Sequence, residues 1–325
     1  MKAIVIENYG DTHQLVLQDM PKPEVKAGHA LLKIKAIGVN FIDIYMRRGE
    51  PFISIPLPFI PGVEAAGVVE AIGEGVTEVV PGDRVAYFGV LGSYAEYNSV
   101  KASQLIPLPE NMSFEMGAAF PLQGMTAEYL MNDCYPIKLT DTILVHAAAG
   151  GVGLICVQWL KKLGAKIIGT VSTEEKAKIV YEAGADHVII YTKQDFVEEV
   201  NRLTEGKGVD YIIDGVGKET FTKDLAAIKT RGTICLFGMS SGEAEPFSPN
   251  SLQNKSITLC GGNLMNYVNS REELLRRANN LLQGIAENWL KIKIDHIFPM
   301  EKAELAQKLL EERKAIGKIV LKIGE

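Results

Sequence analysis

Short apolar stretches alternate with polar positions through about the first 122 residues and end at glycine or proline. A period of two that is broken by turn residues predicts β-strands. The predicted strands are residues 2–7, 15–18, 29–39, 65–72, 84–88, 94–99 and 105–108. Two stretches depart from this pattern and predict short helices, residues 40–48 and 113–120, the second with Ser113 as its N-cap. This part of the chain is therefore predicted to form a β-rich domain, a distorted barrel.

The hydrophobic period changes at about residue 123. Short apolar runs, which predict buried strands, now alternate with segments whose apolar residues recur at helical spacing. The predicted strands are residues 142–146, 166–171, 187–191, 209–214, 232–238 and 256–260, and the predicted helices are residues 124–133, 154–163, 174–183, 194–204, 218–230 and 271–287. Strands joined mostly by helices predict an α/β fold with a parallel, doubly wound, six-stranded sheet.

The last residues return to the β pattern, with predicted strands at 292–298 and 318–323 and an amphipathic helix at 300–313. We expect this tail to rejoin the first domain. The predicted organisation is one discontinuous domain, residues 1–123 and 289–325, and one inserted domain, residues 124–288.

Residues 141–176 are predicted to form a unit of strand, turn, helix and strand. The turn reads Ala148-Ala149-Gly150-Gly151-Val152-Gly153, which is the pattern G-x-G-x-x-G with alanine at the first position. Small residues let the chain reverse sharply and let a pyrophosphate approach the backbone N–H groups at the start of the helix. The strand before the turn and the helix after it supply the expected context, so we predict a dinucleotide site. The alternative is a tight turn of an α/β protein without a nucleotide.

The end of the second strand distinguishes NAD from NADP. An acidic residue there binds the ribose 2′-hydroxyl of NAD, whereas a basic neighbour suits a 2′-phosphate. Residues 169–173 include no acid, while Ser172 offers a hydroxyl donor and Lys176 follows within one helical turn. We therefore predict NADPH. Glu174 and Glu175 count against this prediction if they point inward, and the alternative for Lys176 is an ordinary solvated lysine.

Composition and charge argue against several classes of protein. The net charge of -6 and the lack of a Lys/Arg-rich block argue against a nucleic-acid surface. No apolar run reaches roughly eighteen residues, so no membrane span is predicted. Acidic residues near the start argue against a signal peptide. The four cysteines, at 134, 156, 235 and 260, form no C-x-x-C pair. We expect a cytoplasmic protein in which the last three act as small apolar core side chains.

Six short motifs together resemble one family. They are residues 38–43, 61–67, 81–85, 124–126, 147–153 and 317–321. With them the chain resembles the medium-chain dehydrogenase/reductase superfamily, and within it the zinc-independent quinone oxidoreductase branch of the zeta-crystallin type. This resemblance covers essentially the whole chain, and it implies a GroES-like β-rich domain followed by a Rossmann domain. Residues 49–54 align poorly with the family.

The resemblance implies that no metal is bound at the family's zinc sites. Zinc alcohol dehydrogenases of the superfamily carry a zinc cysteine where this chain has Asn40, a histidine where it has Val63, and a third ligand near residues 122–123. The cysteines of their structural zinc lobe are absent as well, since no cysteine lies between residues 85 and 120. Zinc requires Cys, His or carboxylate ligands. We therefore predict no metal, a structural role for Glu64, and a core position for His146.

The resemblance further implies NADPH-dependent reduction of quinones or related conjugated carbonyl compounds. Residues similar to those that line the nicotinamide and acceptor pocket are Asn40, Asp43 and Tyr45. Predicted cofactor contacts are Thr126, Ala149, Gly150, Gly151, Val152, Ser172, Lys176, Tyr191, Phe237, Asn263 and Lys318. Phe237 and Asn263 are included because they follow strands of the predicted sheet, where doubly wound folds bind ligands. Taken singly, each of these residues also fits an ordinary capping, packing or solvated role.

Two other functions remain open at this stage. One is an enone or 2-alkenal reductase on the same scaffold, and the other is a non-enzymatic NADPH-binding protein. The apolar strand at residues 256–260 is predicted to lie at the edge of the sheet, where an uncovered strand is a liability. The resemblance implies cover by a second copy, so we predict a homodimer formed near residues 256–263.

Overall fold

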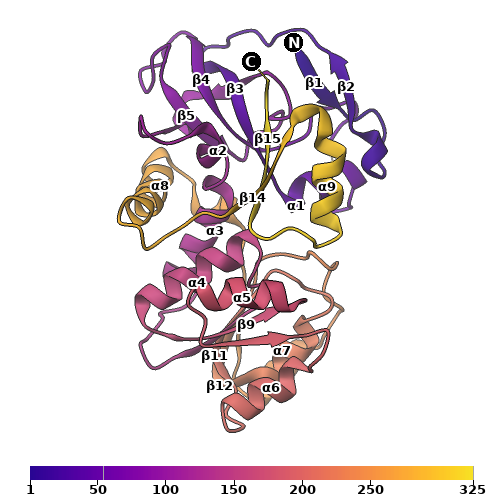
Figure 1. Ribbon diagram of the computed structural model, residues 1–325, viewed down its shortest axis with the longest axis vertical. Coiled ribbons are helices and arrows are strands. Elements are labelled where there is room, and N and C mark those ends of the chain that lie inside the picture. The colour runs from indigo at the N-terminus through magenta and orange to yellow at the C-terminus, as the bar shows by residue number, and fades with distance from the viewer. Residues whose placement is uncertain (54, 325) are drawn as a thin grey trace. The chain divides into compact units, whose positions relative to one another are not determined.

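The computed structural model describes residues 1–53 and 55–324, and these form two compact units (Figure 1). Unit 1 comprises Met1–Leu122, Val268–Asn279 and the chain from Ile292 onward, and unit 2 comprises Gln123–Tyr267 and Asn280–Lys291. Two helices contain residues of both units, α3 (Pro121–Asn132) and α8 (Arg271–Ala286). Ser54, in the poorly aligned segment, and Glu325, in the predicted tail, lie outside the described residues.

Unit 1 is built on a β-sheet, as the alternating pattern predicted. Its described strands are β1 (Lys2–Val5), β2 (Val16–Asp19), β3 (His29–Val39), β4 (Glu64–Ile72), β5 (Arg84–Phe88), β6 (Tyr97–Lys101), β7 (Ile106–Pro107), β14 (Ile294–Pro299) and β15 (Lys318–Lys322). Its helices are α1 (Phe41–Arg48), α2 (Phe114–Gly117) and α9 (Ala303–Glu311). The main sheet has the order β14-β15-β3-β4-β5-β7, with β6 paired to β3. Strands β1 and β2 pair separately.

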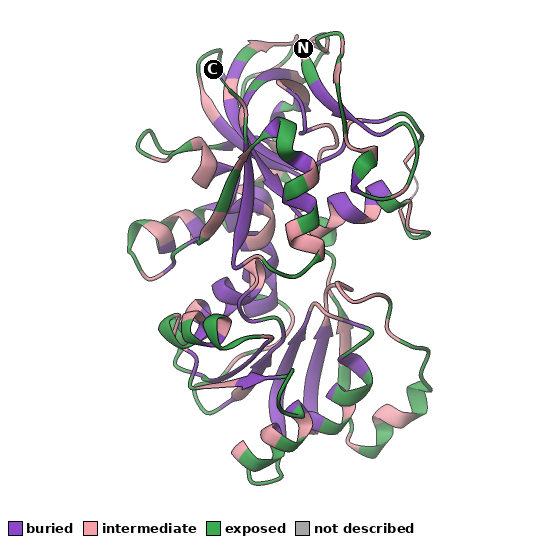
Figure 2. Cartoon of the chain, turned by 45° about the vertical axis from the view of Figure 1, so that its right-hand side comes forward, coloured by how far each residue is buried: buried purple, intermediate pink, exposed green. Residues whose placement is uncertain are grey.

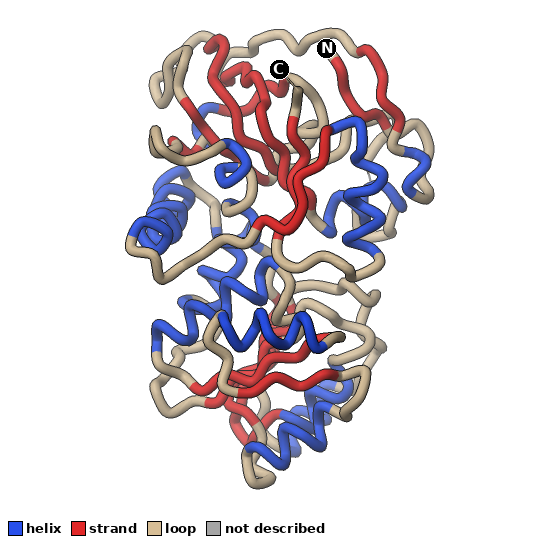
Figure 3. The backbone as a smooth tube through the Cα atoms, in the orientation of Figure 1, coloured by secondary structure: helices blue, strands red, loops and turns tan. Residues whose placement is uncertain are grey.

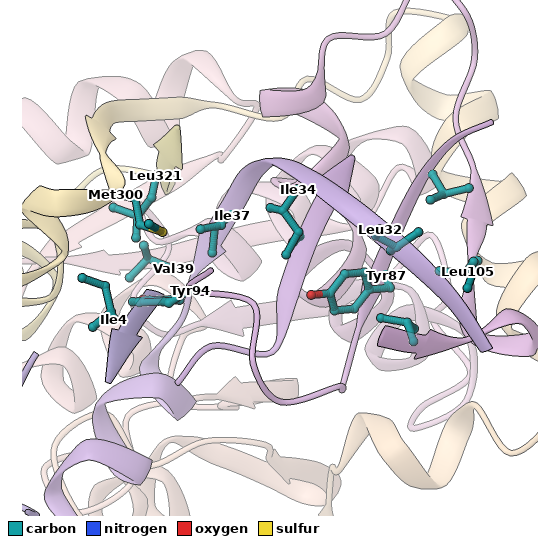
Figure 4. Close-up of a cluster of buried hydrophobic side chains, with 14 of the residues drawn as sticks. Ile4, Leu32, Ile34, Ile37, Val39, Tyr87, Tyr94, Leu105, Met300 and Leu321 are labelled. Atoms are coloured by element: carbon teal, nitrogen blue, oxygen red, sulfur yellow. The ribbon is translucent and has the colours of Figure 1, made fainter. Parts of the chain in front are cut away.

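Strand β3 organises this unit, because it pairs with β4, β6 and β15. The antiparallel pairing of Ile319 with Val39 shows that the tail rejoins the first sheet. Apolar side chains from strands far apart in the sequence meet in one core (Figure 4). Labelled members of this core are Ile4, Leu32, Ile34, Ile37, Val39, Tyr87, Tyr94, Leu105, Met300 and Leu321.

Unit 2 contains the predicted parallel sheet. Its described strands are β8 (Thr142–Val145), β9 (Lys166–Val171), β10 (His187–Ile190), β11 (Val209–Asp214), β12 (Ile228–Leu236) and β13 (Thr258–Gly261). Its complete helices are α4 (Gly151–Leu163), α5 (Glu174–Glu182), α6 (Phe196–Leu203) and α7 (Phe221–Ala227). Both helices and strands make up this unit (Figure 3). The strand order is β10-β9-β8-β11-β12-β13 and every pairing is parallel. This confirms the doubly wound fold, and β13 lies at the sheet edge as predicted.

Burial follows the layers of this unit. All residues of β11, near the centre of the sheet, are buried, whereas the helices expose one side (Figure 2). A near-continuous apolar run is what a strand covered on both faces requires. Within the described part of the chain, no helix combines the length and the apolar character needed to cross a bilayer.

The predicted helix at residues 218–230 is too long. Helix α7 ends at Ala227, and β12 begins at Ile228. Ile228 pairs with Val209 of β11, so pairing in the sheet overrides the helical pattern of the sequence here. The strand predicted at residues 94–99 begins later than expected, since β6 begins at Tyr97.

Candidate functional site

The turn between β8 and α4 presents the start of a helix as an anion site. Gly150 is the N-cap of α4 and has extended backbone angles, φ -75° and ψ 171°. The reversal takes place at Ala147, whose φ of 48° lies in the left-handed region that side chains disfavour. The first N–H groups of a helix have no acceptor within the helix. Those of Gly151 and Val152 are therefore suited to an anionic ligand, because the helix dipole favours negative charge there.

Gly153 allows α4 to pack directly against this turn. A Cβ atom at residue 153 would lie 2.5 Å from the carbonyl oxygen of Ala147 and 2.7 Å from the Cα of Ala148. Both are backbone atoms, so neither can turn aside as a side chain would. The neighbouring Ala149 is buried as well. This close approach is the one that the third glycine of a dinucleotide turn provides.

Gln123 borders the same turn and was not among the predicted cofactor residues. A Cβ atom on Gly151 would lie 1.8 Å from Oε1 of Gln123, so the glycine makes room for this side chain. Among the described residues, this buried Oε1 has no hydrogen-bond partner. A buried acceptor without a donor costs free energy. The glycine cradle, the exposed N–H groups and the unsatisfied amide oxygen together fit a dinucleotide cofactor.

Ser172, Lys176 and Tyr191 lie together at the carboxyl ends of β9 and β10. The Tyr191 N–H donates to the Val171 carbonyl at 3.0 Å, which places Tyr191 beside the end of β9. Thr173 caps α5 by accepting a hydrogen bond from the Lys176 N–H at 3.3 Å, which places Lys176 in the first turn. Tyr191 is 42% exposed, and Ser172 and Lys176 are half-buried.

The acidic neighbours of Lys176 are exposed. Glu174 forms an ion pair with Lys193 at 2.8 Å, and both side chains are exposed. Glu175 is exposed as well. This part of the chain therefore includes residues with a hydroxyl, an ammonium and a phenol, and such donors suit the 2′-phosphate that we predict here.

The other predicted cofactor residues of unit 2 are more dispersed. Thr126 is buried on α3. Phe237 follows β12, and its N–H donates to the Asp214 carbonyl at 2.9 Å. Asn263 follows β13, and its Oδ1 accepts from the Met265 N–H at 3.1 Å, so it also supports a local turn. Their contacts with a cofactor remain predictions.

His146 is a satisfied core histidine, as predicted. Its Nδ1 lies 3.0 Å from the Thr170 hydroxyl and its Nε2 lies 2.8 Å from Oδ1 of Asp224. Burial raises the pKa of Asp224 to about 7, against the attraction of His146. Burial lowers the pKa of His146, but the Asp224 carboxylate outweighs this effect and raises it overall. The pair lies beyond the carboxyl end of β8 and is buried, so it has little surface for a substrate.

Asn40 joins a buried polar network in unit 1. Its Nδ2 donates to the Gly38 carbonyl at 3.1 Å and to Oε2 of Glu64 at 2.9 Å. Its Oδ1 accepts from Nζ of Lys318 at 2.6 Å. The same Nζ lies 2.6 Å from Glu64, and both of these side chains are 0% exposed. The Leu122 N–H donates to the other carboxylate oxygen of Glu64 at 2.7 Å.

This network changes the roles expected for two residues. Lys318 was predicted to contact the cofactor, but its side chain has no exposed surface and it neutralises Glu64 instead. Asn40 was predicted to line the acceptor pocket, and both of its amide hydrogens are engaged inside the protein. We therefore treat both as positioning residues. The structural role predicted for Glu64 agrees with this geometry.

Asp43 forms a capping interaction at the start of α1. Its Oδ2 accepts from the Asn40 N–H at 2.9 Å and from the Tyr94 hydroxyl at 3.1 Å. Its Oδ1 is buried without a hydrogen-bond partner in the described part of the chain. Burial raises the pKa of Asp43 to about 7, against the Asn40 hydrogen bond and the charge of Lys318. Tyr94 was not predicted, because its place beside α1 depends on the fold.

We expect Asp43→Asn to change how stability depends on pH. The pKa of the carboxyl rises from 3.8 to about 7 on folding, so the folded state binds an extra proton between these values. The stabilisation from this group is complete below about pH 4 and is lost as the pH rises through about 7. Relative to the wild type, the variant should gain about 2 kcal/mol between about pH 5 and about pH 8. Urea unfolding at both pH values measures this, and parallel changes in the two proteins would contradict it.

Tyr45 differs from the other two predicted acceptor residues because part of it is exposed. Its ring lies 5.4 Å from that of Phe52, edge to face, and 6.3 Å from that of Phe41. Tyr45 is half-buried, whereas Asn40 and Asp43 are almost fully buried. Of the three, Tyr45 therefore offers the side chain that a substrate can touch.

Two protein families match different parts of the chain. Residues 26–110 match the alcohol dehydrogenase GroES-like domain. Residues 151–280 match the zinc-binding dehydrogenase family.

Named relatives match over most of their length. Quinone oxidoreductase 1 of Escherichia coli (strain K12) is 40% identical over 294 residues, which cover 88% of this chain and 89% of that protein. The 2-haloacrylate reductase of a Burkholderia species is 37% identical over 326 residues, 98% of each chain. A solved structure of Escherichia coli quinone oxidoreductase in complex with NADPH superposes with a TM-score of 0.96 at 37% identity, covering 99% of this chain and 100% of that one.

Proposed function

The chain belongs to the quinone oxidoreductase branch of the medium-chain dehydrogenase/reductases, and from this we propose that it is an NADPH-dependent quinone reductase. Unit 1 would be the GroES-like catalytic domain and unit 2 the Rossmann domain that binds NADPH. The domain boundaries proposed here follow the two compact units, with residues 268–279 joining the first of them.

One observation carries the proposal. Ser172 and Tyr191 follow β9 and β10, and Lys176 lies in the first turn of α5, which is the region where such folds bind a 2′-phosphate. The chain is also similar along its whole length to a quinone oxidoreductase solved with NADPH. The acid that would bind the 2′-hydroxyl of NAD is missing from residues 169–173.

The proposed mechanism relies on positioning. NADPH supplies the hydride when bound. The N–H groups of Gly151 and Val152 would hold the pyrophosphate, and Lys176 would pair with the 2′-phosphate. Thr126, Phe237 and Asn263 are proposed as further contacts with the cofactor. The Tyr45 hydroxyl donates a hydrogen bond to the quinone oxygen that gains charge. The buried network of Asn40, Glu64 and Lys318 holds α1, and therefore Tyr45, in place.

Lys176→Ala should weaken the binding of NADPH about 10- to 100-fold, because a hydrogen bond to a charged group contributes about 1.5–3 kcal/mol. The binding of NADH, which lacks the 2′-phosphate, should change less than about twofold. Lys178→Ala on the same helix is the matched control, since Lys178 is exposed. Dissociation constants from calorimetric titration test this. An equal loss for both cofactors would rule out the 2′-phosphate role.

Tyr45→Phe should lower kcat/KM for a quinone about tenfold and leave the affinity for NADPH unchanged. The variant removes one hydroxyl donor, worth about 1.4 kcal/mol, and keeps the aromatic contact with Phe52. Steady-state kinetics with one quinone at saturating NADPH measures the change. An unaltered kcat/KM would remove Tyr45 from the acceptor site.

A second activity is favoured by one specific relative, the 2-haloacrylate reductase. Its name describes reduction of a conjugated acid, so hydride transfer to carbon rather than to a quinone is the alternative for this chain. Purified protein should be assayed with a para-quinone, an unsaturated aldehyde and a 2-haloacrylate under the same conditions. A higher kcat/KM for the quinone supports the proposal. Reduction of the unsaturated aldehyde or the 2-haloacrylate, without reduction of the quinone, would favour the second activity over the proposed quinone reductase.

We further propose that the reaction needs no metal, because Asn40 and Val63 stand where the zinc alcohol dehydrogenases carry ligands. Protein freed of metal by chelation should keep its kcat, and a loss restored by zinc would refute this.

We also propose a homodimer formed along the edge strand β13. A solution mass equal to one chain would refute it.

We propose a cytoplasmic location, which the free cysteines support. Fractionation of cells tests this location.

A further inference from the structure

Three cysteines from separate parts of unit 2 converge on one point. Cys134 follows α3, Cys235 lies in β12 and Cys260 lies in β13. Their sulfur atoms all lie within 4.8 Å of one another. Cys235 and Cys260 are register partners in adjacent parallel strands, so they point to the same face of the sheet. Cys134 reaches that face from the helix.

Polar and aromatic groups contact these thiols, and the cluster is partly exposed. The Cys134 sulfur lies 3.7 Å from the Tyr267 hydroxyl. The Cys260 thiol donates to the Ile234 carbonyl at 3.6 Å. The Tyr267 ring stacks on Tyr129 with centroids 4.3 Å apart, which holds this wall of the cluster. Cys235 is buried, whereas Cys134 and Cys260 are half-buried, so a small ion can reach the sulfurs.

The spacing of the sulfurs fits a shared cation better than a disulfide. Bonds of about 2.3 Å from a metal to thiolates place the sulfurs of one site about 4 Å apart. A disulfide requires about 2.0 Å between two sulfurs and leaves the third unused. All three sulfurs lie within 4.8 Å of one another, as a single shared cation requires, whereas a disulfide would use two of them.

We propose that Cys134, Cys235 and Cys260 form a three-thiolate site for a soft d10 cation, Zn²⁺ or Cu⁺. Thiolate ligands select these cations over hard ones such as Mg²⁺. The thiols release their protons on binding, and no oxidant or reductant is consumed. The site lies in unit 2 and involves neither Asn40 nor Val63, so it is separate from the zinc positions of the superfamily. It does not depend on the proposed reductase activity.

The cation would tie the end of α3 to the two edge strands. Cys260 lies in β13, the outermost strand of the sheet, which has a partner strand on one side within unit 2. A ligand that binds the folded state and not the unfolded chain raises stability. The metal should therefore raise the thermal midpoint of the wild-type protein, and it should not do so in a variant that lacks one of the three cysteines.

The test uses the reduced, metal-free full-length chain, titrated with Zn²⁺ in one arm and with Cu⁺ under anaerobic conditions in the other. We expect one bound cation per chain in at least one arm, measured by mass spectrometry of the metal after gel filtration. Each of Cys134→Ser, Cys235→Ser and Cys260→Ser should weaken binding at least about 100-fold. Cys156→Ser is the matched control, because Cys156 is buried on α4 outside the cluster.

X-ray absorption of the loaded wild type keeps the proposal testable if a serine variant fails to fold. We expect sulfur neighbours at about 2.3 Å from the cation. Failure of both cations to bind, binding that survives the three serine substitutions, or a shell of oxygen and nitrogen alone would overturn the proposal. Loss of two thiols in air by a protein that binds neither cation would assign the cluster to a disulfide instead.

Discussion

Lys318→Met is expected to lower the free energy of unfolding by about 3–5 kcal/mol, because it leaves the Glu64 carboxylate buried without its cation. The two groups lie 2.6 Å apart, and both side chains are 0% exposed. Methionine keeps the length of the side chain and removes the charge, so the loss is electrostatic rather than a cavity. Asn40 also loses its 2.6 Å hydrogen bond from Lys318. Urea unfolding at neutral pH measures the change.

Two further variants make this prediction specific. Lys322→Met removes an exposed lysine of the same strand, 3.5 Å from Glu115, and should cost less than about 1 kcal/mol. Adding Glu64→Gln to Lys318→Met removes the uncompensated charge and should restore about 2 kcal/mol or more. A Lys318 variant no less stable than the Lys322 variant would show that the buried pair contributes little.

Gly153→Ala is expected to weaken the binding of NADPH at least about 100-fold. The added Cβ would lie 2.5 Å from the Ala147 carbonyl oxygen, so either the turn or α4 must shift. The N–H groups proposed to hold the pyrophosphate, those of Gly151 and Val152, lie where the turn meets α4. Overpacking of this kind also costs about 1–3 kcal/mol of stability. The dissociation constant from calorimetric titration is the readout, with urea unfolding to confirm that the variant is folded.

Gly261→Ala is the control for this variant. A Cβ atom at residue 261 would meet nothing within 4 Å, although the residue lies in the same sheet. Its affinity for NADPH should stay within about twofold of the wild type. If Gly153→Ala behaves in the same way while remaining folded, then the close approach of helix and turn does not shape the cofactor site.

Elements whose pattern is local were predictable from the sequence. The long alternating strand β3 and the unit from β8 to β9 show their period within a few residues, so residues 29–39 and 166–171 match their predicted bounds. The dinucleotide turn was predictable for the same reason, since its glycines lie within six positions. The end of α7 was not, because Ile228 becomes a strand residue through pairing with β11.

Features that depend on distant residues escaped prediction. Glu64 and Lys318 are separated by 254 positions and meet because β15 returns to β3 beside β4. Cys134, Cys235 and Cys260 form no C-x-x-C pair, so the sequence did not indicate that they meet. The register of β12 with β13 and the end of α3 bring them together. Motif spacing detects clusters along the chain and misses those that a sheet assembles.

Steady-state oxidation of NADPH and of NADH by the purified protein, with one para-quinone and no added metal, tests the proposed function most directly. We expect quinone-dependent turnover with a kcat/KM for NADPH at least about tenfold higher than for NADH, as a charged contact to the 2′-phosphate requires. Equal values for the two cofactors would contradict the phosphate site at Ser172, Lys176 and Tyr191. Tight binding of NADPH without turnover of the quinone would contradict the reductase.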